Sequence, residues 1–153
     1  MPSFKHVVAL CASTATAALI VVGIVSGEIA RHVLQTLLFW PAIALGFRNS
    51  RHTGWVAAPL LAFWLLVMAL IWAYLLHWST MASGVYGSTE IAMTVVVGIA
   101  AVIGLAASFA IPPQPRRLWL LSLPLFLVQY LVMTISFKPP FTEDRLFLAW
   151  ILP

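Results

Sequence analysis

Charged residues are scarce in this chain. Of its 153 residues, only 8 are Lys or Arg and 4 are Asp or Glu, whereas 63% are hydrophobic. Soluble domains are about 25% charged, so this composition excludes an ordinary soluble domain. It indicates a chain whose apolar side chains are buried in a lipid bilayer.

Cysteine and the usual catalytic signatures are also missing. Cys11 is the only cysteine, which excludes an intrachain disulfide, a thiolate zinc site and paired-cysteine redox chemistry. The sequence contains no GxSxG, HExxH or CxxCH signature and no convincing internal repeat. The net charge of +4 comes without a basic stripe interleaved with exposed aromatics, so nucleic acid is not expected as a partner.

Long apolar runs are what the chain does contain. Because lipid offers no partner to unpaired backbone groups, runs close to the roughly 20 residues that cross a bilayer should be helical. We therefore predict an all-α integral membrane protein, a single transmembrane domain over residues 1–153 with the lipid bilayer as its first partner. Its five transmembrane helices should cover about 7–25, 29–47, 55–78, 91–111 and 118–137, with 138–153 as an interfacial tail. Pro41 and Pro124 lie inside two of these segments and predict kinks.

The basic residues predict an orientation for this bundle. If the N-terminus is cytoplasmic, five of the eight Lys and Arg residues fall inside, and all four acidic residues fall outside. The inside set is Lys5, Arg48, Arg51, Arg116 and Arg117. The positive-inside rule thus favours a cytoplasmic N-terminus and an external C-terminus, in a plasma membrane or bacterial inner membrane.

A cluster of polar residues is expected at the outer end. The spacing i, i+3, i+4, i+7 puts four of them on one helix face at the start of the second segment, and the deepest lies roughly 10 Å below the first. A charge in hydrocarbon costs several kcal/mol unless it is paired or hydrated, so this face should point at other helices or water. The third segment ends, and the fourth begins, at the same level. The predicted ligand-binding residues are Glu28, Arg31, His32, Gln35, His77 and Glu90.

The same residues also have a purely structural interpretation. Ser26 is placed to cap the second segment, and Glu28 and Glu90 suit the first turns of their helices because of the helix dipole. Glu28 and Arg31 are spaced to form an intrahelical ion pair. These alternatives remain open at the level of the sequence.

Small residues repeat every four positions in two segments, which lets helices approach closely. They are Ala9, Ser13 and Ala17 in the first segment and Ala100, Gly104 and Ser108 in the fourth. The pattern favours packing of these two segments within the chain. It also allows contact with other membrane subunits, or self-association through Ala100, Gly104 and Ser108.

Three functions are compatible with these features. The favoured one is a non-catalytic subunit of a membrane complex, or a small-ligand-binding protein, with a polar site at the outer mouth. The alternative is a haem- or metal-dependent redox protein that uses His32 and His77, because imidazole is the commonest ligand of transition metals. The third is a lipid-modifying enzyme with a histidine–glutamate base. The sequence identifies no catalytic residue, no metal site and no cofactor.

Overall fold

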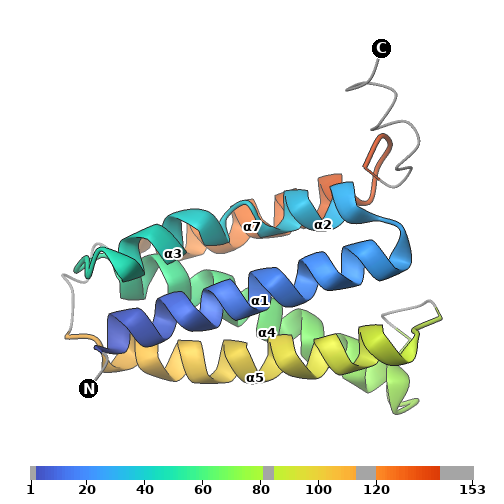
Figure 1. Ribbon diagram of the computed structural model, residues 1–153, viewed down its shortest axis with the longest axis horizontal. Coiled ribbons are helices and arrows are strands. Elements are labelled where there is room, and N and C mark those ends of the chain that lie inside the picture. The colour runs from blue at the N-terminus through green and yellow to red at the C-terminus, as the bar shows by residue number, and fades with distance from the viewer. Residues whose placement is uncertain (1–2, 81–84, 113–119, 142–153) are drawn as a thin grey trace.

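The computed structural model describes residues 3–80, 85–112 and 120–141, and all of its regular structure there is helical. Figure 1 shows these helices running side by side. Their bounds are α1 Phe4–Ser26, α2 Ile29–Thr36, α3 Phe39–Phe47, α4 Thr53–Leu75, α5 Ser88–Ala110 and α7 Ser122–Ser136. The all-helical prediction is confirmed for these residues. Most of the expected tail at 138–153 lies outside them.

Three helices, α1, α4 and α5, are each 23 residues long and apolar enough to cross a membrane. The pair α2 and α3 forms a fourth candidate span, bent by 50° between its two halves. Helix α7 is apolar but has only 15 residues. The described part of the chain therefore has three or four candidate spans and is that of a helical membrane protein.

The bend in the second segment lies just before Pro41. Leu37 N–H donates to the Leu34 carbonyl and Trp40 N–H donates to the Leu37 carbonyl, so the chain tightens locally between α2 and α3. Pro41 has no N–H to give to Leu37, and it sits in the first turn of α3, where a helix tolerates proline. The kink expected at Pro41 is thus a break. Pro124 lies in the first turn of α7, where a helix also tolerates proline. The start of the expected segment lies outside the described residues, so the kink at Pro124 stays a prediction.

Helices α1 and α4 form the centre of the bundle. Helix α1 packs on α5, α3, α2 and α4, whereas α7 packs on α4 and α2. Trp64, Phe39 and Leu60 are among the largest fully buried side chains. Many other apolar side chains are exposed on the outside of the bundle, which suits a surface that faces lipid.

Helices α1 and α5 pack against each other, as the small-residue pattern favours, and the pattern is buried fully in α5 and partly in α1. Gly104 in α5 faces α1 and α4, because a Cβ added there would lie 2.9 Å from both Cys11 Cβ and Leu61 Cδ1. Ala100 and Ser108 are also buried. In α1, Ala9 is buried and Ala17 is exposed, and the buried face also includes Val8, Ala12, Ala15 and Leu19.

The two ends of the bundle differ in composition. One end, here called the Gly27 end, gathers the end of α1, the start of α2, the end of α4, the start of α5 and the end of α7 (Figure 1). The opposite end, here called the Asn49 end, holds the start of α1 and the connection from α3 to α4. Glu28, Arg31 and Glu90 lie toward the Gly27 end, and Lys5, Arg48 and Arg51 lie at the Asn49 end.

Candidate functional site

A cavity of about 760 Å³ opens inside the bundle toward the Gly27 end. Its walls come from α1, α2, α4, α5 and α7, together with Val85 and Tyr86 ahead of α5 and Phe137 after α7. The polar lining residues are Ser26, Glu28, Arg31, His32, Gln35, Trp64, Tyr86, Glu90 and Thr94. The remaining lining is aliphatic, apart from Phe137 and methionines of three helices, Met68, Met93 and Met133.

Helix α2 and the residue before it contribute Glu28, Arg31 and His32 to the cavity wall. Arg31 forms an ion pair with Glu28 one turn earlier, and its guanidinium carbon lies 5.0 Å from the centre of the Phe137 ring. The side chains of Arg31 and Glu28 are 18% and 28% exposed. This pairing lowers the cost of holding a charge beside the apolar slab.

His32 and Gln35 lie deeper and are almost fully buried, at 5% and 2% exposure. The His32 ring nitrogen Nδ1 lies 3.0 Å from the Glu28 carbonyl oxygen. Gly23 of α1 makes room for this side chain, since a Cβ there would lie 2.9 Å from His32 Cβ. Both residues therefore face the interior, as the cost of polar groups in lipid predicts.

Gln35 also belongs to a polar network that joins α2 to α7. Gln35 Nε2 donates to Ser136 Oγ at 2.8 Å, and Ser136 Oγ donates to the Met133 carbonyl at 2.6 Å. Gln129 Nε2 donates to the Gln35 carbonyl at 3.1 Å. Gln129 and Ser136 are fully buried, and they are the only buried residues within α7.

Helix α5 and the residues ahead of it close the cavity. The Gly87 N–H donates to the Glu90 carboxylate at 2.6 Å, so Glu90 caps α5 as the structural interpretation expects. The Tyr86 ring lies 6.1 Å from that of Tyr74. Burial, and then the nearby Tyr74 and Glu90, raises the pKa of Tyr86 above its usual value. Its phenol therefore stays protonated and can donate a hydrogen bond.

His77 is placed differently from the other predicted site residues. It is exposed, follows the end of α4 and has a left-handed backbone with φ of 59°. The cavity lining includes Glu28, Arg31, His32, Gln35 and Glu90 but not His77. Within the described residues, no group of three or more His, Cys, Asp or Glu side chains is arranged to hold a metal ion.

Two buried donors at the cavity wall have no hydrogen-bond acceptor among the described residues. They are the indole Nε1–H of Trp64, a side chain that is 2% exposed, and the Nε–H of Arg31. A buried donor left unpaired costs about 1–3 kcal/mol. Both atoms are closed off from the open space of the cavity.

Four residues of this region were not expected from the sequence. The sequence does not indicate that Trp64 and Tyr86 belong to the site, because only folding brings them into the cavity lining with residues of α2. Gln129 and Ser136 do carry a signal: they are seven residues apart in an apolar run, which places them on one helix face. That face is the one that α7 turns toward α2.

Comparison of the chain with protein-family models, curated proteins and solved structures finds no match. The class of the protein therefore rests on its fold, which is a helical bundle with three or four candidate membrane spans.

Proposed function

We propose that this chain is a small-ligand-binding protein of the membrane, whose site is the cavity lined by Glu28, Arg31, His32, Gln35 and Glu90. The observation that carries the proposal is the cavity itself: these polar groups converge on a space of about 760 Å³ inside an otherwise apolar bundle. Ligand pockets typically have this size, with a mostly apolar lining and a few convergent polar groups. Capping accounts for Glu90, but it requires neither the burial of His32 and Gln35 nor an open space beside them.

The proposal is tested by filling the cavity. Met93→Trp places a larger side chain on the cavity wall, whereas Ala92→Trp places the same side chain on an exposed position of α5 outside the lining. After gentle extraction, native mass spectrometry of the wild type and of Ala92→Trp should show a bound small molecule at one per chain. Met93→Trp should lose it. Equal retention by all three proteins, or no bound molecule on the wild type, would contradict the proposal.

We further propose that the chain crosses the membrane five times, with a cytoplasmic N-terminus and an external C-terminus. The Asn49 end, with Lys5, Arg48 and Arg51, then faces the cytoplasm, as the positive-inside rule predicts. Helix α7 runs from the Asn49 end to the Gly27 end (Figure 1), in line with a fifth passage. The proposed location is a plasma membrane or bacterial inner membrane.

Cysteine labelling tests this topology. In a Cys11→Ala background, single cysteines at Ser50 and Gln114 should both be labelled from the cytoplasmic side by a membrane-impermeant maleimide. A cysteine at Gly27 should react only from outside. Labelling of Ser50 and Gln114 from opposite sides would contradict the five-span proposal.

The other functions suggested by the sequence have distinct signatures. A redox protein using His32 and His77 would show a Soret band in the visible spectrum of the purified protein. A non-catalytic subunit would co-purify with a second membrane chain in constant proportion, or with a second copy of itself. Both measurements are independent of the cavity-filling experiment.

A further inference from the structure

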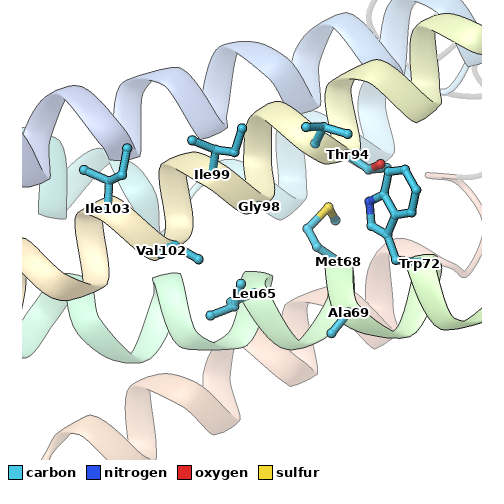
Figure 2. A pocket seen from close by; sticks show the side chains of 10 residues that line it. Leu65, Met68, Ala69, Trp72, Thr94, Gly98, Ile99, Val102 and Ile103 are labelled. Atoms are coloured by element: carbon cyan, nitrogen blue, oxygen red, sulfur yellow. The ribbon is translucent and has the colours of Figure 1, made fainter.

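The wall of the cavity between α4 and α5 is packed with side chains. Met68 of α4 and Thr94 of α5 line the cavity and also a separate apolar groove of about 510 Å³. Figure 2 shows both side chains between the two helices. They are only 4% and 6% exposed, so this wall is closed by packing.

The wall between α2 and α7 is closed by polar contacts instead. The Arg31 guanidinium carbon lies 5.0 Å from the centre of the Phe137 ring. Gln35 Nε2 donates to Ser136 Oγ at 2.8 Å, and the Gln35 carbonyl accepts from Gln129 at 3.1 Å. We call these three contacts the latch. Because Arg31, Gln35 and Phe137 also line the cavity, the latch closes the cavity between α2 and α7.

The latch is the kind of contact that opens at low cost. Lipid is as apolar as the side chains of the bundle, so no hydrophobic gain holds two membrane helices together. Hydrogen bonds between membrane helices contribute little on average, because their groups find other partners when the helices separate. Ser136 has such a partner already, since its Oγ donates to the Met133 carbonyl within α7 at 2.6 Å.

The other end of α7 is attached to α4. The Phe126 ring packs edge-on against that of Phe63, with their centres 5.4 Å apart, and Ser122 Oγ donates to the Trp55 carbonyl at 3.3 Å. Ser122 and Phe126 lie in the first two turns of α7. Ser136 lies fourteen residues after Ser122, which is roughly 21 Å along the helix. The apolar attachment and the latch are thus at opposite ends of α7.

We propose that α7 is a gate between the cavity and the membrane. It pivots on Ser122 and Phe126, and its other end separates from α2 when the latch opens. Val33 on α2 and Leu131 on α7 are exposed, so both helices border the lipid and a gap between them admits molecules from the bilayer. An open state populated at roughly 0.1–10% is typical of such equilibria. The inference rests on the proposed function and adds the route to the site.

The first experiment measures how fast N-ethylmaleimide reacts with single buried thiols of the full-length protein in phosphatidylcholine nanodiscs. In a Cys11→Ala background, Ser136→Cys reports on the latch. Ser108→Cys is the matched reporter in α5, because Ser108 is also buried and its hydroxyl also donates to a carbonyl of its own helix. Ser136→Cys should react at least about tenfold faster, since local opening costs less than opening of the core. Equal rates would overturn the gate.

Gln129→Leu removes one bond of the latch. It should speed the reaction of Ser136→Cys about fivefold or more, because the closed state then leaves the buried Gln35 carbonyl unpaired. The rate of Ser108→Cys should not change. Thr134→Val, at an exposed position of α7, is the matched control and should change neither rate. Equal acceleration of both thiols would indicate general unfolding, and no acceleration would exclude the latch; either result contradicts the gate.

A crosslink tests the pivot. With Phe126 replaced by p-benzoylphenylalanine, illumination should join α7 to α4 in the same yield with and without Gln129→Leu, because the contact with Phe63 persists when the gate opens. Loss of the crosslink in Gln129→Leu would show that α7 detaches along its whole length, which would overturn the pivot.

A second thiol reaction tests whether the gap leads from lipid into the cavity. N-dodecylmaleimide, which stays in the bilayer, should react with Met93→Cys on the cavity wall about fivefold faster or more when Gln129→Leu is added. Ala92→Cys, exposed on α5 outside the lining, should react at an unchanged rate. An unchanged rate at Met93→Cys would mean that α7 moves without opening the cavity to lipid, and would overturn the entrance.

The gate and the proposed site can fail separately. If Met93→Trp displaces a bound molecule while Gln129→Leu leaves both thiol reactions unchanged, the gate fails and the proposed function stands. If Gln129→Leu speeds both reactions but the wild type holds no bound molecule, the proposed function fails and only the motion of α7 remains.

Discussion

Replacing Gly46 with alanine should force α1 and α3 apart and lower the free energy of unfolding by about 3 kcal/mol, at the upper end of the usual cost of overpacking. A Cβ at Gly46 would lie 2.6 Å from Ala9 Cβ and 2.7 Å from the Lys5 carbonyl oxygen. Because the second of these atoms belongs to the backbone of α1, no side-chain rotation relieves the clash. The two helices approach this closely only because Gly46 has no side chain.

The measurement is thermal unfolding in a mild detergent, followed by loss of the monodisperse peak in size-exclusion chromatography. Gly98→Ala is the matched control, because its Cβ would meet Met68 Cβ at an ordinary contact distance of 3.9 Å. Alanine is also favoured over glycine in a helix by about 1 kcal/mol, so Gly98→Ala should be neutral or slightly stabilising. Similar midpoints for the two variants would show that α1 and α3 are not in the contact described.

Replacing Gln129 with leucine should loosen α7 from α2 and cost about 1–3 kcal/mol, the penalty for leaving a buried acceptor unpaired. Gln129 Nε2 is the donor to the Gln35 carbonyl, which lies in the last turn of α2 before the break. With the side-chain amide gone, that carbonyl is left in a dry interior. The loss is partly offset because Gln129 Oε1 is itself buried without a partner in the described residues.

Thr134→Val is the control for this change. Thr134 lies on the same helix but is exposed, and its hydroxyl bonds only within α7, to the Tyr130 carbonyl. It should leave the thermal midpoint within the error of the measurement, whereas Gln129→Leu should lower it and raise protease sensitivity around residues 120–141. Equal midpoints would argue that hydrophobic contacts with α4 hold α7 in place without the Gln129 bond.

Helix α7 exposes apolar side chains and buries polar ones, the opposite of a surface helix in a soluble protein. Its exposed side chains include Leu123, Leu127 and Leu131, whereas its buried ones are Gln129 and Ser136. In lipid there is no hydrophobic gain from bringing apolar faces together, so hydrogen bonds and close packing decide which face turns inward. The same rule accounts for the inward orientation of His32 and Gln35.

Much of the architecture could be predicted from the local sequence. The helices over 4–26, 53–75 and 88–110 lie within a few residues of the expected segments, because the length and apolarity of a run are sufficient to require a helix in lipid. The inward face of α2 follows from the spacing of its polar residues and from the cost of exposing them to hydrocarbon. The presence of a break near Pro41 follows from its missing N–H.

Only the tertiary structure decided which residues meet. The sequence predicts both His32 and His77 as site residues. In the structure, however, His77 has a left-handed backbone after the end of α4 and is not part of the cavity lining. Trp64 joins the cavity although it lies within an apolar run, and Gly104 packs inside the bundle between α1 and α4. Such placements depend on the rotation of each helix about its axis and on contacts between residues distant in the chain. Hydropathy and residue spacing describe one helix at a time. They therefore determine that these helices form and which of their faces are costly to expose to lipid. Packing between helices determines which residues those faces contact.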